Sequence, residues 1–101
     1  MGEMKHTPGP WVVGPVDDTV VTHLGKDGRR YEIAQIDGDY NSPDEWPVME
    51  ANARLIATAP DLLRELIDIH RLLCEVAPEY AESPMAVSAR YIIARAKAPS
   101  P

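Results

Sequence analysis

Two side chains in the C-terminal half have the spacing of metal ligands. His70 and Cys74 stand four residues apart, so on a helix both point to the same side. Imidazole and thiolate are ligands that zinc prefers, and His6 or His23 would have to complete such a site. Both residues also fall within an apolar helical stripe, where a hydrogen-bonded histidine and a buried thiol are the usual occupants. We therefore interpret them as packing residues and expect neither a metal nor a cofactor.

Carboxylate pairs that could serve acid–base catalysis all lie in expected turns or at a helix start. They are Asp17 and Asp18, Asp37 and Asp39, and Asp44 and Glu45. Turn chemistry and helix capping account for these pairs. The sequence holds no phosphate-binding glycine loop, no nucleophile elbow and no zinc-finger spacing. We therefore expect a protein that is not an enzyme, with a metal-assisted hydrolase as a remote alternative.

Two polar runs remain as candidates for ligand binding. Asn52 and Arg54 stand together in a helical segment. The simpler interpretation pairs Arg54 with Glu50 across one helical turn and leaves Asn52 exposed. The functional interpretation has Arg54 holding an anionic group while Asn52 acts as a selective hydrogen-bond donor and acceptor.

The second run, HTPGPW, occupies residues 6–11. Its simpler interpretation is an N-terminal arm, residues 1–10, that the large ring of Trp11 anchors to the core. Its functional interpretation is a rigid loop that presents His6, Thr7 and backbone N–H groups to a ligand. Two prolines would lower the entropy cost of ordering that loop.

The elements that must position these residues are strands first and helices second. Residues rich in β-branched types predict strands at 11–13, 19–24 and 30–36. Asp27-Gly28 predicts a two-residue type I′ hairpin turn, which would place Leu24 opposite Tyr31 and His23 opposite Glu32.

Helices are expected from Asp44 onward, where that residue would be an N-cap. Pro60 permits two arrangements: two helices, the second capped by Thr58, or one long helix kinked at the proline. We favour two helices, followed by a third that Ser83-Pro84 caps and whose stripe is Met85, Ala89, Ile92 and Ala96.

Apolar periodicity is strongest after Pro60. Two adjacent stripes predict one broad buried helix face: Leu62, Leu66, Ile69, Leu73 and Val76, with Leu63, Ile67, His70 and Cys74 beside them. This face is wider than a small sheet needs, so we expect a homodimer through the helices.

The 101 residues predict one domain: an arm at 1–10, a β-rich half at 11–36, a helical half at 44–97 and a disordered tail at 98–101. Strands followed by helices predict the α+β class, with a small three-stranded antiparallel sheet and two or three helices packed on one face. The net charge of −6 resides in residues 1–50 and argues against direct nucleic-acid binding. Without a signal or membrane segment, the expected location is the cytoplasm.

The pairing of two motifs resembles a known family. HTPGPW at residues 6–11 and NARLIATAPDLL at 52–63 are similar to motifs of small uncharacterised phage and prophage proteins, in which HTPGPW precedes NARLIA-x-AP-x-LL. The resemblance covers residues 5–70 and implies a phage accessory protein in the host cytoplasm.

Our first functional hypothesis is a non-enzymatic, counter-defence protein that binds and sequesters a small anionic ligand such as a host signalling nucleotide. Arg54 would pair with phosphate, Asn52 and Thr7 would hydrogen-bond, and an aromatic ring would stack on a base. The alternative is an acidic interaction module that inhibits or adapts a host protein. The expected ligand-binding residues are His6, Thr7, Trp11, Tyr31, Asn52 and Arg54.

Overall fold

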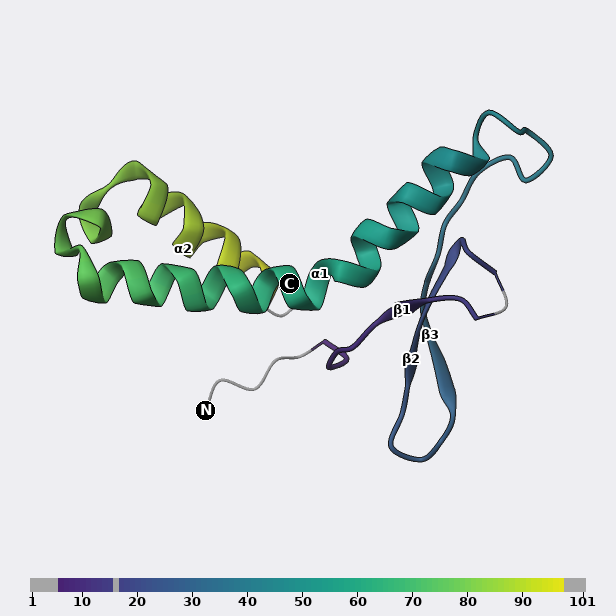
Figure 1. Ribbon diagram of the computed structural model, residues 1–101, viewed down its shortest axis with the longest axis horizontal. Coiled ribbons are helices and arrows are strands. Elements are labelled where there is room, and N and C mark those ends of the chain that lie inside the picture. The colour runs from purple at the N-terminus through teal and green to yellow at the C-terminus, as the bar shows by residue number, and fades with distance from the viewer. Residues whose placement is uncertain (1–5, 16, 98–101) are drawn as a thin grey trace. The chain divides into compact units, whose positions relative to one another are not determined.

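The chain forms a three-stranded sheet followed by helices, as predicted for the α+β class (Figure 1). The computed structural model describes residues 6–15 and 17–97. The predicted tail at 98–101 and residues 1–5 of the arm lie outside them. The elements are β1 (Val12–Val13), β2 (Val20–Leu24), β3 (Arg30–Gln35), α1 (Trp46–Val76), the 3-10 helix η1 (Pro78–Glu82) and α2 (Pro84–Lys97).

Contacts divide the chain into two compact units, which are described separately below. One unit is Thr7–Pro60, and the other is Met1–His6 with Asp61–Pro101. The sheet therefore belongs to the first unit, and α2 belongs to the second.

In the described part of the chain, no helix is both long enough and apolar enough to cross a membrane.

The sheet has the order β1-β2-β3 with antiparallel neighbours, so the three predicted strands are confirmed. The predicted hairpin register is wrong by one residue, because Leu24 pairs with Arg30 and His23 with Tyr31. The turn has three residues rather than two: Gly25 N donates to Arg29 O at 2.8 Å across it. Gly28 alone adopts the left-handed conformation that such a turn needs, with φ of 82°.

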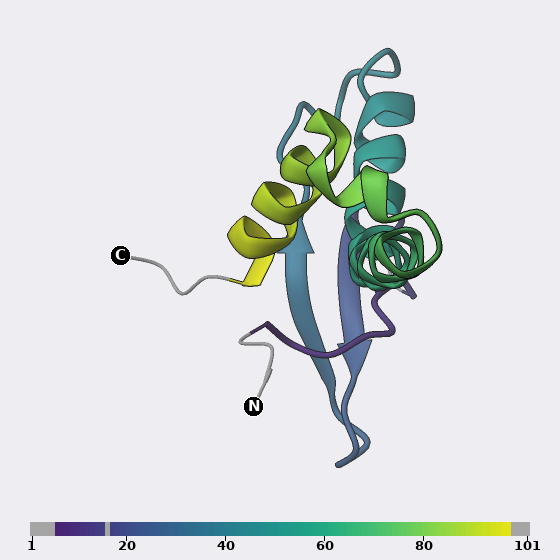
Figure 2. The ribbon, with the colours of Figure 1, turned by 90° about the vertical axis from the view of Figure 1, so that its left-hand side faces the viewer.

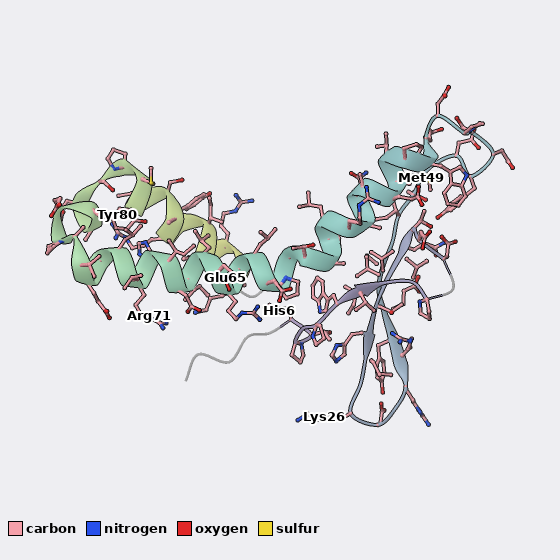
Figure 3. The ribbon with its side chains drawn as sticks, viewed as in Figure 1. His6, Lys26, Met49, Glu65, Arg71 and Tyr80 are labelled. Atoms are coloured by element: carbon pink, nitrogen blue, oxygen red, sulfur yellow. The ribbon has the colours of Figure 1, made fainter. Side chains whose placement is uncertain are left out.

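The core of the Thr7–Pro60 unit joins the sheet to the first part of α1. Val21, Ile36, Met49 and Ala53 are its buried residues, and the half-buried ring of Trp11 packs against them as predicted. Residues 46–60 of α1 thus cover one face of the sheet. Figure 3 shows Met49 near the start of α1, far from Lys26 at the hairpin tip.

Helix α1 continues through Pro60, so the favoured two-helix interpretation is wrong. Thr58 is not an N-cap. Its hydroxyl donates to the Arg54 carbonyl at 2.7 Å, which is the bond that a threonine inside a helix makes to the preceding turn.

In the second unit, η1 reverses the chain and α2 lies beside residues 61–76 of α1 (Figure 1, Figure 2). The predicted Ser83 cap is confirmed, because Ala86 N donates to Ser83 Oγ at 3.1 Å. The predicted broad buried face is only partly right. One of its two stripes is half-buried throughout: Leu63, Ile67, His70 and Cys74. In the other stripe Leu66 and Leu73 are half-buried, whereas Leu62, Ile69 and Val76 are exposed.

The predicted stripe of α2 is also largely wrong. Of its four members only Ala89 is buried, and Ala86 is the other buried residue of the helix. Met85 and Ile92 instead have 70% and 49% of their surface exposed. The buried residues of α2 are thus small alanines, while most of its large apolar side chains are exposed and only Ile93 is half-buried.

Candidate functional site

Two of the predicted ligand-binding residues line the same hollow. Thr7, from the HTPGPW run, and Tyr31, from β3, both lie in a hollow of about 630 Å³ in the Thr7–Pro60 unit. The other lining residues are His23, Gly25, Lys26, Asp27, Glu32 and Ile33. We call this space the hairpin hollow, because the β2–β3 hairpin supplies most of its wall.

A hydrogen bond holds the aromatic ring in the hairpin hollow. The Tyr31 hydroxyl donates to Asp27 Oδ2 at 2.5 Å, and Arg29 N donates to the same carboxylate at 3.0 Å. These bonds lower the pKa of Asp27, with the tyrosine bond as the larger cause, and the pKa of Tyr31 is raised by the same bond. The ring lies close over Gly25, where a Cβ would come within 2.7 Å of Tyr31 Cε2.

Carboxylates outnumber cations in the hairpin hollow. Lys26 is its formal cation, and Asp27 and Glu32 are its carboxylates. Anions bind where cations outnumber carboxylates, because each carboxylate repels them at short range. The hairpin hollow is therefore a poor match for the strongly anionic ligand expected from the sequence.

The HTPGPW run contacts its unit through Trp11 and Gly9. Trp11 Nε1 donates to the Thr7 carbonyl at 3.1 Å, which ties the arm to the ring that anchors it. A Cβ on Gly9 would come within 3.2 Å of the Pro60 side chain, so the arm passes close to α1 at this proline. His6 belongs to the other compact unit.

Asn52 and Arg54 are exposed on α1, and neither lines the hairpin hollow. Among the described residues, ion pairs join Arg64 to Asp61 and Arg71 to Asp68, so the simpler pairing of Arg54 with Glu50 is absent. The structure thus brings Thr7 and Tyr31 together, with Trp11 bonded to Thr7, and leaves the two helical residues outside the hollow.

A second hollow lies between residues 61–76 of α1 and α2, where the sequence analysis placed no ligand. It has a volume of about 690 Å³, and we call it the helical groove. Its apolar lining is Ile67, Cys74, Ile93 and Ala94, and its polar lining is His70, Arg71, Glu75, Arg90 and Lys97.

The helical groove carries an excess of positive charge within an acidic protein. Arg71, Arg90 and Lys97 line it together with one carboxylate, Glu75, although the whole chain has a net charge of −6. Arg71 also pairs with Asp68, outside the lining, at 3.8 Å. Arg90 Nη2 donates to the Ala81 carbonyl at 3.1 Å. That bond uses one of the five N–H donors of the guanidinium group. An apolar floor beside cations from two helices suits an anion with an apolar portion.

His70 and Cys74 form part of the groove wall and contact each other. Nδ1 of His70 lies 3.0 Å from the Tyr80 hydroxyl, and Sγ of Cys74 lies 3.8 Å from His70 Nε2. Figure 3 shows Tyr80 on η1 pointing toward α1. Across the described ranges, no group of three or more His, Cys, Asp or Glu side chains is placed to hold a metal ion. These contacts are those of hydrogen-bonded packing residues.

One sequence signal for the helical groove was available. Residues 84–97 contain three basic residues and no acidic residue, in contrast to the rest of the chain. The partners of these cations across the groove lie on α1, and only the reversal of the chain at η1 brings them together.

Comparison with known proteins places the chain in a phage family. A family model described as Salmonella phage P22 protein Y8K6 matches residues 1–100. No curated protein and no solved structure matches the chain. The match covers both compact units and confirms the expectation of a phage protein, whereas the two motifs that suggested it stay untested. The chain belongs to the family of Salmonella phage P22 protein Y8K6.

Proposed function

We propose that this phage protein acts by binding rather than by catalysis, and that it sequesters a small anion with an apolar portion. The observation that carries the proposal is the helical groove, where Arg71, Arg90 and Lys97 surround an apolar floor. A host signalling nucleotide, the ligand class expected from the sequence, combines a negative charge with an apolar portion. This role is that of an accessory, counter-defence protein.

The size and chemistry of the helical groove support this ligand class. Its volume of about 690 Å³ lies within the range of roughly 300–1,000 Å³ typical of small-molecule sites. Guanidinium groups bind phosphate and carboxylate through two parallel hydrogen bonds, and Arg71 and Arg90 approach the groove from different helices. The apolar part of the ligand would lie on Ile67, Ile93 and Ala94.

The hairpin hollow is the second place where a ligand would bind. There Tyr31 would stack on a ring, Thr7 would hydrogen-bond, and Trp11 would hold the arm in place. Because two carboxylates and one lysine line this hollow, it favours a ligand with less negative charge than a nucleotide.

A separate observation favours an interaction module as the second candidate function. Carboxylates of the β3–α1 loop and the start of α1 are exposed: Asp37, Asp39, Asp44 and Glu45. Such a cluster attracts a basic protein surface at low ionic strength. Rising salt would release the partner, and Asp37→Lys with Asp39→Lys would abolish its capture if this surface is the binding site.

Thermal unfolding of the full chain in the presence of cyclic and linear nucleotides tests ligand binding. A nucleotide at 100 times its Kd stabilises the native state by about 2.7 kcal/mol, and the midpoint of unfolding rises accordingly. Inorganic phosphate and the free nucleosides are the matched controls, because each lacks one of the two properties that the groove recognises. Absence of a shift with every nucleotide at millimolar concentration would overturn the nucleotide proposal.

A further inference from the structure

Both helices of the second unit expose apolar side chains at a spacing of seven residues. On α1 these are Leu62, Ile69 and Val76, which have 51%, 53% and 66% of their surface exposed. On α2 they are Met85 and Ile92, with 70% and 49% exposed. A spacing of seven residues keeps side chains on one side of a helix, so each set forms a stripe.

The two stripes point away from the helical groove. An α-helix turns by about 100° per residue, so Ile69 lies about 200° around α1 from Ile67, which lines the groove. Ile92 likewise lies about 200° around α2 from Ala94, which lines the groove from the other side. The stripes therefore share the opposite side of the helix pair, which we call the reverse face.

One charged residue stands beside each stripe, and the two have opposite signs. Glu65 lies three residues after Leu62 and four before Ile69, and Arg95 lies three residues after Ile92. Neither is in an ion pair within the described part of the chain, and the Arg95 guanidinium lies 5.5 Å from the Tyr91 ring centroid.

The net charges of the two helices also have opposite signs. Residues 61–76 hold four acidic and two basic residues, whereas residues 84–97 hold three basic residues and no acidic one. A partner with its own α1 against this α1 would bring together two segments of net negative charge, and like charges in contact are unfavourable. A partner with its α2 against this α1 would place Arg95 beside Glu65 instead.

We propose that the reverse faces of two copies pack together, with residues 61–76 of α1 from each copy against α2 of the other. The arrangement is two-fold symmetric, so the same contact forms twice and closes. Two helix pairs then make a four-helix bundle whose interior contains Leu62, Ile69, Val76, Met85 and Ile92. Burial of these five side chains drives association, and the two Glu65–Arg95 pairs set its orientation.

Light scattering coupled to size exclusion tests the proposal with the full chain. The wild type is expected to have twice the mass of one chain, and Ile69→Asp or Ile92→Asp is expected to give the monomer mass. Glu65→Arg and Arg95→Glu are each expected to weaken the dimer by at least tenfold in Kd. Their combination restores opposite charges across the interface and is expected to recover dimerisation. Glu82→Arg, an exposed charge reversal on η1, is the control and should leave the mass unchanged.

Three results would overturn the proposal. They are a monomer at every concentration, a dimer that survives both aspartate substitutions, and a double charge reversal that is no better than either single one. Circular dichroism of each variant establishes that the helices still form. The inference is independent of ligand binding, because the helical groove lies on the other side of the helix pair and would still bind its ligand in a monomeric variant.

Discussion

Nδ1 of His70 on α1 lies 3.0 Å from the hydroxyl of Tyr80 on η1, and their rings meet edge to face with centroids 5.5 Å apart. This contact joins the end of α1 to the segment that reverses the chain. Because His70 also lines the helical groove, Tyr80 helps to fix one wall of the candidate site through its neighbour.

Tyr80→Phe removes this hydrogen bond and keeps the ring contact. We expect the free energy of unfolding to fall by about 1 kcal/mol, the usual net value of one such bond. Urea denaturation measures the change. Tyr91→Phe is the control, because Tyr91 has 62% of its surface exposed and retains its ring beside Arg95. Equal stability of the two variants would show that the His70–Tyr80 bond contributes nothing.

Arg71→Gln and Arg90→Gln test the helical groove directly. If each guanidinium holds the anionic group of a nucleotide, each variant should lose about 1.5–3 kcal/mol of binding free energy, or roughly 10-fold to 100-fold in Kd. Isothermal titration calorimetry with the nucleotide that gives the largest thermal shift measures this loss. Arg64→Gln is the control, because Arg64 is on the same helix and pairs with Asp61 as Arg71 pairs with Asp68, but it does not line the groove. A loss as large in that variant would point to a general charge effect.

The sequence predicts the elements well, because local patterns decide them. The three strands, the end of α1 before Pro78 and the Ser83 cap all follow from residue types within a few positions. The predicted register of the hairpin is wrong because its turn has three residues rather than two. Asp27 uses its side chain to accept from Arg29 N, and of the three turn residues only Gly28 adopts a positive φ.

Other features depend on contacts that local patterns do not encode. Thr58-Ala59-Pro60 has the composition of a helix start, but α1 passes through it and the threonine bonds backward to Arg54. The helical groove joins α1 residues to α2 residues that are distant in the sequence. The arginines that line it look, from periodicity alone, like an ordinary solvated side of a helix.

Gly38→Ala is expected to destabilise the Thr7–Pro60 unit by overpacking. A Cβ on Gly38 would come within 2.6 Å of Met49 Sδ, and Met49 is only 2% exposed, so its side chain has little room to move. The expected loss in the free energy of unfolding is about 1–3 kcal/mol, measured by urea denaturation.

A double-mutant cycle separates this clash from other effects of the alanine. In a Met49→Ala background the added Cβ meets no thioether, so the loss caused by Gly38→Ala should largely disappear. Gly28→Ala is the matched control, because a Cβ there meets nothing within 4 Å and is disfavoured by its φ of 82° instead. Its cost should be the same with Met49 or Ala at position 49, and a Gly38→Ala cost that is equally insensitive would exclude the clash.

Asp17 gives the Thr7–Pro60 unit an acid-sensitive element. Its Oδ1 accepts from Thr19 N at 2.8 Å and from Thr19 Oγ1 at 2.7 Å, and these bonds lower the pKa of Asp17 below its ordinary value of 3.8. The folded state therefore binds a proton at Asp17 less readily than the unfolded state does. The stabilisation from these bonds is complete well above pH 3.8 and is lost as the pH falls through the lowered pKa.

Asp17→Asn keeps an acceptor for Thr19 but cannot titrate, so the decline in unfolding midpoint between neutral and strongly acidic pH should become shallower than in the wild type. Asp18→Asn removes the neighbouring exposed carboxylate and is the control. Equal acid slopes in the two variants would show that the Thr19 bonds do not couple folding to protonation of Asp17.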